Sequence, residues 1–318
     1  MMKWLKIIFA SIISIGLGLI FLYSGYTKLY PVIETFEFTF VDIGIGNWYT
    51  APVIARALIG LEFFIGALLI INYNLKKFTL PFTVGLLLFF IIYLAIQIGI
   101  SGNKGNCGCF GEHLKMTPLE AIIKNVVMIA GAVLVYFLWD GWKLKFNKLF
   151  LLLFALPPFL IPFIINPIDY SYSSNNLQEK VGYKLDLELL YQPEDTVKVK
   201  VPNYELRKGK HVLAFLSLSC PHCRIAAKKF RLIKKNNPQL SIYFVLNGDK
   251  EKYQPFIDDT KADNIPYSYC NGKTFVQLAS TSLPQIYYID NSIVVKKVDY
   301  YELNQYKIED WVNKGILK

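Results

Sequence analysis

The fold of the C-terminal half is decided by Ala214-Phe215-Leu216-Ser217-Leu218-Ser219-Cys220-Pro221-His222-Cys223. Its apolar run predicts a buried strand that ends at Ser219-Cys220, where a helix begins. Cys220 then lies at the N-terminus of the helix, where free backbone N–H groups and the positive end of the helix dipole favour a thiolate over a thiol. Cys223 follows one turn later and can resolve a mixed disulfide. The stretch therefore predicts a redox-active cysteine pair.

Two other uses of a Cys-x-x-Cys pair are a zinc half-site and a pair of inert core thiols. No second Cys-x-x-Cys or His-x-x-x-His follows within the ~15 to 20 residues that a zinc site usually spans. His222 should stabilise the Cys220 thiolate when it is protonated, and this pushes the couple towards oxidant. Redox chemistry is therefore the favoured interpretation.

The first half of the chain has the composition of a membrane protein. Of the 318 residues, 53% are hydrophobic, and the formal net charge is +10. The apolar excess lies before residue 167, where stretches long enough to cross ~30 Å of hydrocarbon recur. Predicted spans cover residues 5–24, 51–73, 79–100, 118–139 and 149–165. Because no Arg-rich patch with interleaved aromatic residues occurs, we expect a lipid bilayer and no nucleic acid as partner.

Lysines between the spans predict the orientation. One side has Lys3, Lys6, Lys76, Lys77, Lys143, Lys145 and Lys148, and the other has Lys28, Lys104 and Lys115. The richer side is predicted to be cytoplasmic, so residues 25–50, 101–117 and everything after 166 lie outside. The fifth span decides the last point, because three prolines interrupt it and without it the C-terminal domain would be cytoplasmic.

Three ionisable residues lie within predicted spans, namely Arg56, Glu62 and Lys124. Ionisable groups in a membrane usually face the bundle interior and mark a pathway or ligand, so these three are a candidate site for a quinone or other carrier. Glu62, near the midplane, is expected to face the interior. Alternatively, Arg56 and Lys124 extend outward to water or pair with Glu120.

Two external segments have distinctive sequences. Residues 35–40, Thr-Phe-Glu-Phe-Thr-Phe, alternate with period two, which indicates a short strand or, preferably, an ordered loop on the bilayer. Residues 103–111 form a glycine-rich turn that exposes Cys107 and Cys109. A Cys-x-Cys disulfide closes a small strained ring that is easily reduced and suits exchange. A metal site that also uses His113, or a structural bridge, are the alternatives.

Several of these motifs resemble those of the DoxX/MauE superfamily of four-helix membrane proteins. They are Leu22-Tyr23-Ser24-Gly25-Tyr26-Thr27-Lys28-Leu29, Glu62, Cys107-Gly108-Cys109-Phe110-Gly111 and Lys124-Asn125. The resemblance covers residues 1–140. It implies a compact four-helix bundle linked to disulfide or electron-transfer chemistry at the outer face, with a connection to a membrane quinone.

The region from residue 185 onward resembles the thioredoxin fold. Strands are predicted at 211–218, 240–246, 285–289 and 292–296, with helices at 221–235, 249–262 and 303–314. Cys220-Pro221-His222-Cys223 has the same central dipeptide as the DsbA family of periplasmic oxidants. Leu283-Pro284 lies where the family has a cis-proline that faces the cysteines and pairs with the substrate strand. The resemblance therefore adds Pro284 to the expected catalytic residues.

One departure from that family affects the chemistry. Thioredoxins commonly have a buried acid six residues before the first cysteine, but here the position is Ala214. A proton acceptor for Cys223 must then come from water or another group. TlpA-like reductants share the fold, so the direction of electron flow stays open, and Cys270 is expected to be a lone thiol in a turn.

The predicted fold class is a polytopic helical membrane bundle with 4 + 1 transmembrane helices, followed by an α/β thioredoxin-like domain. The expected domains are 1–140 (membrane bundle), 141–166 (basic cytoplasmic loop and fifth helix), 167–180 (linker) and 181–318 (extracytoplasmic domain). The leading hypothesis is a thiol–disulfide oxidoreductase of the bacterial inner membrane, which passes electrons between Cys220/Cys223 and Cys107/Cys109 and acts on extracytoplasmic thiol or disulfide proteins. The alternatives are a copper-binding protein that uses the same cysteines and a non-catalytic structural subunit.

Overall fold

A computed structural model describes residues 2–30, 33–47, 49–111, 114–143, 148–168, 181–191, 202–279 and 282–315. The chain divides into two compact units, Met1–Tyr170 and Ser171–Lys318. Each unit has its own hydrophobic core.

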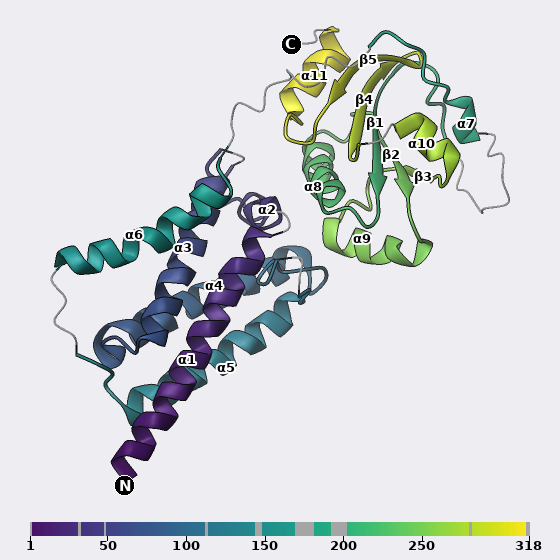
Figure 1. Cartoon of the computed structure of the whole chain (residues 1–318). Helices are drawn as coiled ribbons and strands as arrows, with labels where there is room; N and C mark the ends of the chain where they lie inside the picture. The colour runs from purple at the N-terminus through teal and green to yellow at the C-terminus, as the bar shows by residue number, and fades with distance from the viewer. Residues whose placement is uncertain are drawn as a thin grey trace. The chain divides into compact units, whose positions relative to one another are not determined.

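Four helices of the first unit are long and apolar enough to cross a membrane, which makes this a multi-pass membrane protein. They are α1 (Met2–Leu29), α3 (Ala51–Ile70), α4 (Leu80–Ser101) and α5 (Pro118–Leu138), with a π-helical turn η1 (Leu75–Thr79) before α4 (Figure 1). Large apolar side chains such as Ile12, Ile92 and Phe137 are exposed on the outside of the bundle. In water such a surface would be costly, whereas lipid tails solvate it.

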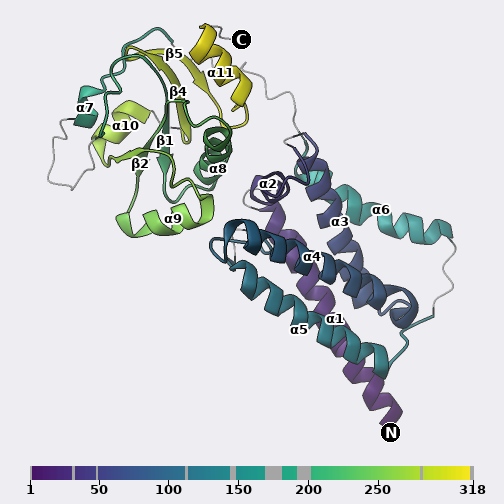
Figure 2. The same ribbon diagram turned by 180° about the vertical axis from the view of Figure 1, so that it is seen from behind.

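Small residues let the helices of this unit approach closely. A methyl group on Gly18 of α1 would lie 2.7 Å from the Gly66 carbonyl oxygen of α3, so neither helix tolerates a side chain at this crossing. Such glycine contacts are typical of membrane helices, whose association depends on close packing. Helices α4 and α5 lie side by side (Figure 2). Phe21, Ile65 and Met128 are buried between the helices.

The segment after α1 is a helix, and the predicted strand or loop on the bilayer is wrong. Helix α2 (Glu34–Asp42) buries Phe36, Phe38 and Phe40, which lie on different sides of it. Its period-two aromatic pattern arises because the helix is covered on several sides, by α3 and by the Cys107–Cys109 loop. An all-round apolar helix has no 3.6-residue pattern by which the sequence could reveal it.

A further helix, α6 (Lys148–Ile165), packs against α3. The Phe64 ring centroid lies 6.2 Å from that of Phe159, and Asn166 donates a hydrogen bond to the Leu29 carbonyl. The end of α6 therefore meets the end of α1. At ~1.5 Å per residue its 18 residues extend ~27 Å, which is slightly less than the ~30 Å hydrocarbon core. The described apolar part of this helix, Leu153–Ile165, is shorter than the length needed to cross a membrane. The fifth span therefore stays a prediction.

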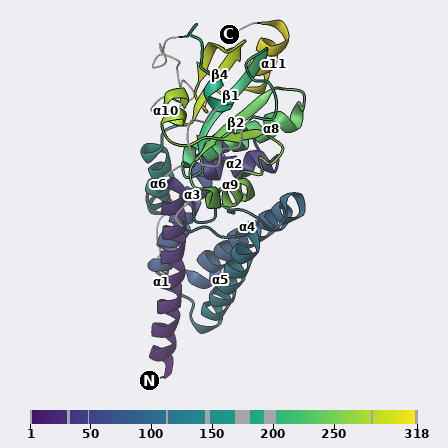
Figure 3. The same cartoon turned by 90° about the vertical axis from the view of Figure 1, so that its right-hand side faces the viewer.

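The second unit is built on a five-stranded mixed sheet in the order β3-β2-β1-β4-β5. Figure 3 shows its central strands β2, β1 and β4 side by side. The strands are β1 (Lys210–Ser217), β2 (Ile242–Asn247), β3 (Tyr267–Tyr269), β4 (Gln285–Asp290) and β5 (Ile293–Val298). The first three are parallel, and β4 and β5 are antiparallel to their neighbours. The predicted thioredoxin-like α/β fold is confirmed, including the hairpin at residues 285–298.

Helices cover both faces of this sheet. Leu213 and Phe215 of β1 face a core that includes α7 (Glu188–Tyr191) and α10 (Lys273–Ala279). On the other face Phe230 of α8 (Pro221–Asn236) packs on Phe244. That face is also covered by α11 (Gln305–Lys314), while α9 (Tyr253–Thr260) follows the 3₁₀ turn η3 (Lys250–Lys252). The sequence analysis missed β3 and α10. The strand β3 has only 3 residues and the helix α10 only 7, and neither is long enough to show a clear hydrophobic period.

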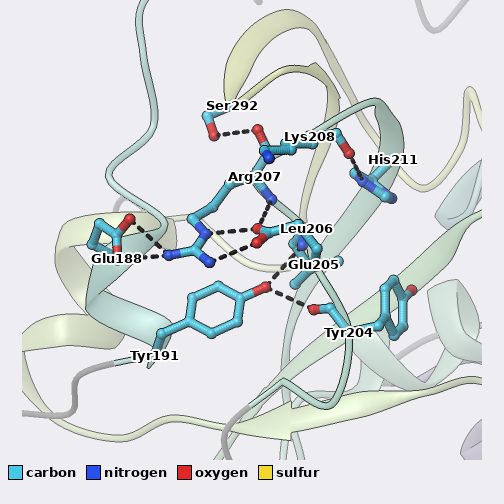
Figure 4. Close-up of polar contacts among 9 residues, drawn as sticks. All are labelled: Glu188, Tyr191, Tyr204, Glu205, Leu206, Arg207, Lys208, His211 and Ser292. Atoms are coloured by element: carbon cyan, nitrogen blue, oxygen red, sulfur yellow. Dashed lines mark hydrogen bonds and ion pairs between the residues drawn. The ribbon is translucent and has the colours of Figure 1, made fainter.

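A group of polar contacts around Arg207 fixes the segment that enters β1 (Figure 4). Arg207 forms ion pairs with Glu188 at 2.8 Å and with Glu205 at 2.6 Å. The Tyr191 hydroxyl donates to the Tyr204 carbonyl and accepts from the Leu206 N–H. These contacts hold α7 against the start of β1. They lie at the end of β1 opposite to Cys220, and we read them as structural.

Candidate redox sites

The Cys220–Cys223 turn forms where the parallel strand β1 ends and α8 begins. Cys220 is the residue before α8, with φ −83° and ψ 123°, and Pro221 is the first helical residue. The Cys220 side chain is partly exposed, whereas Cys223 is fully buried and its Sγ accepts a hydrogen bond of 3.3 Å from the Ser217 N–H. Both are free thiols. One sulfur is therefore open to a partner and the other lies behind it.

The two thiols of this turn are electrostatically unequal. Hydrogen bonds from Cys223 and from His222 lower the pKa of Cys220 to about 4, against the effect of burial. Burial raises the pKa of Cys223 well above its usual value. Cys220 is thus a thiolate at neutral pH and Cys223 a thiol. This is the division of labour expected of a nucleophilic and a resolving cysteine.

A buried ion network that the sequence analysis missed lies behind the turn. Arg224 donates to the Leu218 carbonyl at 3.1 Å and pairs with Asp259 of α9 at 3.1 Å. Lys228, one turn further along α8, also lies 3.1 Å from Asp259. The network ties the loop before Cys220 to α8 and α9. The i, i+4 spacing of Arg224 and Lys228 puts them on one helix face, but nothing in the sequence marks Asp259 as their partner.

The other residues predicted for this site have separate positions. The Leu283-Pro284 bond is cis, as predicted, and the pairing of Gln285 with Phe215 puts it at the end of β1 that leads to Cys220. The His222 ring centroid lies 5.5 Å from that of Tyr300. Ala214, in the position of the family's acid, is fully buried, and its strand neighbour Phe244 packs on α8. The small side chain leaves room for that packing.

The Cys107–Cys109 loop is folded into the bundle, so the prediction that it exposes its cysteines is wrong. Cys107 is 1% exposed and Cys109 8%, and both are free thiols. Ser24 of α1 donates to the Cys109 carbonyl at 3.0 Å. Gly111, at φ +55°, lies so close to the Thr27 carbonyl that any Cβ would overlap its oxygen. Gly111 thus serves close packing of the loop against α1.

A small cavity next to these thiols contains the main polar site of the first unit. Lys28 forms an ion pair with Glu62 at 2.7 Å, and both side chains are 3% exposed. The cavity holds ≈ 20 Å³, about the space of one water molecule. Its polar lining comes from four helices and the loop: Ser24, Lys28, Glu62, Tyr93, Cys107, Cys109, Lys124 and Asn125. As predicted, Glu62 faces the interior. Lys28 was assigned to the outside surface, and its pairing with Glu62 was missed.

Of the three ionisable residues predicted to share a site, Glu62 and Lys124 lie together and Arg56 lies apart. Lys124 lines the cavity with Glu62, and its Nζ lies 4.4 Å from the Phe110 ring centroid. Arg56 is absent from that lining; it pairs with Glu37 of α2 at 2.6 Å and donates to the Asn166 carbonyl at 2.7 Å. Arg56 therefore ties α2 and the end of α6 to α3. Glu120 instead completes the cap of α5 with Thr117.

Cys270 lies just after β3, is 3% exposed, and burial raises its pKa to about 11. Among the described residues no three His, Cys, Asp or Glu side chains are grouped so that they could hold a metal ion. His113, the extra ligand considered above, lies outside the described residues.

One family model and several known proteins match this chain. Residues 6–138 match the family described as methylamine utilisation protein MauE, which confirms that resemblance. Protein TlpB of Flavobacterium psychrophilum is 30% identical over 299 residues, covering 80% of this chain and 81% of that protein. A secreted Mycobacterium tuberculosis disulfide oxidoreductase is 16% identical, covers 33% of this chain and 81% of its own, and has a TM-score of 0.27. The thioredoxin domain of a Bacteroides vulgatus thiol–disulfide oxidoreductase is also 16% identical over 34% and 81%, with a TM-score of 0.28. The length and identity of the TlpB match show that the chain belongs to the family of protein TlpB.

Proposed function

We propose that this protein is a membrane-bound thiol–disulfide oxidoreductase in which Cys220 is the nucleophile and Cys223 the resolving cysteine. The observation that carries the proposal is the pairing of a partly exposed, low-pKa sulfur at a helix N-terminus with a buried thiol one turn later. His222 stabilises the Cys220 thiolate, and the backbone beside cis-Pro284 pairs with a thiol or disulfide protein substrate.

Activity of the full-length protein in nanodiscs tests this assignment. Cys220→Ser should abolish both the reduction of a disulfide-bonded protein such as insulin and the oxidation of a reduced, dithiol protein. Cys270→Ala is the matched control, because it removes a cysteine of the same unit that is remote from α8 in sequence and buried. Full activity of the Cys220→Ser protein would refute the proposal.

The Cys107/Cys109 pair is proposed as the redox partner of Cys220/Cys223. Two contacts support a common side of the membrane: Asn166, after α6, meets Leu29, and Gly111, after Cys109, meets Thr27, two residues earlier in α1. The chain thus leaves the first unit at the end of the bundle to which the cysteine loop belongs. Exchange requires that the buried loop opens, because Cys107 and Cys109 are covered in the closed structure.

Mixed-disulfide trapping in the full chain tests this exchange. Cys223→Ser is combined with either Cys107→Ser or Cys109→Ser, and non-reduced peptides are identified by mass spectrometry. A link between the loop peptide and the Cys220 peptide is expected in at least one variant. Its absence from both would end the internal exchange proposal while leaving the activity of Cys220 untouched.

The lysine distribution supports an orientation with the second unit outside the bacterial inner membrane. A membrane-impermeant maleimide should therefore label Cys220 in intact spheroplasts. Labelling that appears only after lysis would place the unit in the cytoplasm.

A membrane quinone is proposed as electron carrier, but not at a site made by all three of the ionisable residues that the sequence suggested. Glu62 and Lys124 line the same cavity, but Arg56 does not, and ≈ 20 Å³ is too small for a quinone ring. A quinone would have to react at the surface of the bundle or after the loop moves. Reduction of a water-soluble quinone analogue by the reduced protein, lost in Glu62→Gln, is the measurement that would support it.

A further inference from the structure

The cavity beside the Cys107–Cys109 loop has an unbalanced charge. Its charged lining residues are two lysines, Lys28 and Lys124, and one carboxylate, Glu62. Lys28 holds both Glu62 oxygens at 2.7 Å, so this carboxylate is already paired. Within the described part of the chain, no carboxylate forms an ion pair with Lys124. A cation in such surroundings is costly unless an anion lies near it.

Among the described side chains around Lys124, a cysteine can serve as the anion. Lys124 Nζ lies over the ring of Phe110, the residue next to Cys109. The Cys109 carbonyl is bound by Ser24, which in turn accepts a hydrogen bond from Lys28 at 2.7 Å. Cys109 therefore lies between the two lysines. Lys124 can be satisfied electrostatically by a thiolate at this position.

The two sulfurs of the loop differ in the same way as those of the second unit. The Cys107 thiol donates a hydrogen bond to the Cys109 sulfur and, with Lys124 and Lys28 nearby, lowers the pKa of Cys109 to about 7. Its role as donor to Cys109, together with burial, raises the pKa of Cys107 well above the usual value. The Cys107 amide is also fixed, because it donates to the Met116 carbonyl at 2.8 Å.

We propose that Cys109 is the exchanging sulfur of the membrane unit, stabilised as a thiolate by the hydrogen bond from Cys107 and by the charge of Lys124, and that Cys107 is its resolving partner. The assignment of roles rests on the proposed exchange between the two cysteine pairs, whereas the electrostatic effect of Lys124 on the Cys109 thiolate stands without it. Lys124 and the Lys28–Glu62 pair act as positioning residues, because they set the charge around Cys109 without reacting.

The corresponding exchange balances in sulfur bonds, electrons and protons. The Cys109 thiolate attacks the Cys220 sulfur of the Cys220–Cys223 disulfide; the Cys109–Cys220 bond forms and Cys223 leaves and takes up a proton. Cys107 then loses a proton and attacks Cys109, which forms the Cys107–Cys109 disulfide and releases Cys220 as a thiolate. Two electrons thus move from the loop to the second unit, and the reverse sequence returns them.

The first experiment measures the charge on Cys109 alone. In full-length protein in nanodiscs, Cys107, Cys220, Cys223 and Cys270 are changed to Ser, and the ultraviolet absorbance of the remaining thiolate is followed against pH. Adding Lys124→Met should raise the midpoint by about one unit or more, a tenfold loss of thiolate near neutral pH. Lys124→Arg should restore it. Lys104→Met is the matched control, since Lys104 is an exposed lysine in the loop that contains Cys109.

A second measurement separates the two sulfurs. In the trapping experiment, Cys107→Ser should accumulate the Cys109–Cys220 link, and Cys109→Ser should accumulate at least about tenfold less of any link. Equal trapping by both variants would overturn the assignment of Cys109 but leave the exchange standing. An unchanged Cys109 midpoint in Lys124→Met, compared with Lys104→Met, would overturn the role of Lys124 whatever the trapping shows.

Discussion

Replacing His222 with Phe tests how far the side chain between the two cysteines sets the reactivity of Cys220. The Phe ring can keep the aromatic contact with Tyr300, whose centroid lies 5.5 Å from that of the imidazole. The hydrogen bond and the positive charge that act on the Cys220 sulfur are lost. The hydrogen bond from Cys223 remains, so the pKa of Cys220 should rise without returning to that of a free thiol.

The size of the change follows from the lost hydrogen bond. A hydrogen bond to a charged group contributes about 1.5–3 kcal/mol, and one pKa unit corresponds to about 1.4 kcal/mol. The pKa of Cys220, about 4 in the natural protein, should therefore rise by about 1–2 units. Because the bond stabilises only the reduced form, the reduction potential should fall by about 30–60 mV.

The dependence on pH has a definite sign. A thiol whose folded-state pKa lies below its unfolded value stabilises the folded, reduced protein above that lowered pKa. This contribution grows from about pH 4 up to the unfolded pKa near ~8.5, and it disappears as the pH falls through 4. In the His222→Phe protein the contribution should disappear about 1–2 pH units higher.

The assay uses full-length protein in which Cys107, Cys109 and Cys270 are changed to Ser, so that only one pair absorbs. Thiolate absorbance gives the pKa of Cys220, and equilibration with glutathione buffers gives the potential. Agreement of the two shifts is itself a check, since both report the same free energy. A midpoint unaltered by His222→Phe, or a natural protein that titrates like a free thiol, would refute the reasoning.

Two predictions concern the membrane unit. Gly111→Ala should push the Cys107–Cys109 loop off α1, because the added methyl overlaps the Thr27 carbonyl, and the loop thiols should then react faster with maleimide. Gly102→Ala is the control: it has a similar positive φ of 74° but open space around the position, and its reaction rate should stay near that of the natural protein. Glu62→Gln should destabilise the bundle by about 3–5 kcal/mol in a reversible SDS titration, since Lys28 is left buried and unpaired. The double variant Lys28→Met/Glu62→Leu should recover much of that loss, and equal loss in both would argue against the pair.

Comparison of the two cysteine pairs shows where sequence information is sufficient. Cys220 and Cys223 lie on one continuous strand–turn–helix, so the local sequence alone predicted that Cys220 precedes a helix and that Cys223 lies one turn into it. Cys107 and Cys109 lie on a loop whose position depends on α1 and α2, and their burial was not predicted. Local hydrogen bonding governs the first case, and packing between distant segments governs the second.

The amino-acid sequence alone determined the four membrane helices, the α/β unit and the position of Cys220 at a helix N-terminus, because hydrophobic length, strand and helix periodicity and helix capping act over short stretches of chain. Only the tertiary structure decided the partners of the buried charges: Lys28 with Glu62, Arg56 with Glu37, and Arg224 with Asp259. Each pair joins residues of different helices, and a charge taken out of water selects whichever opposite charge the folding of the whole chain brings within reach.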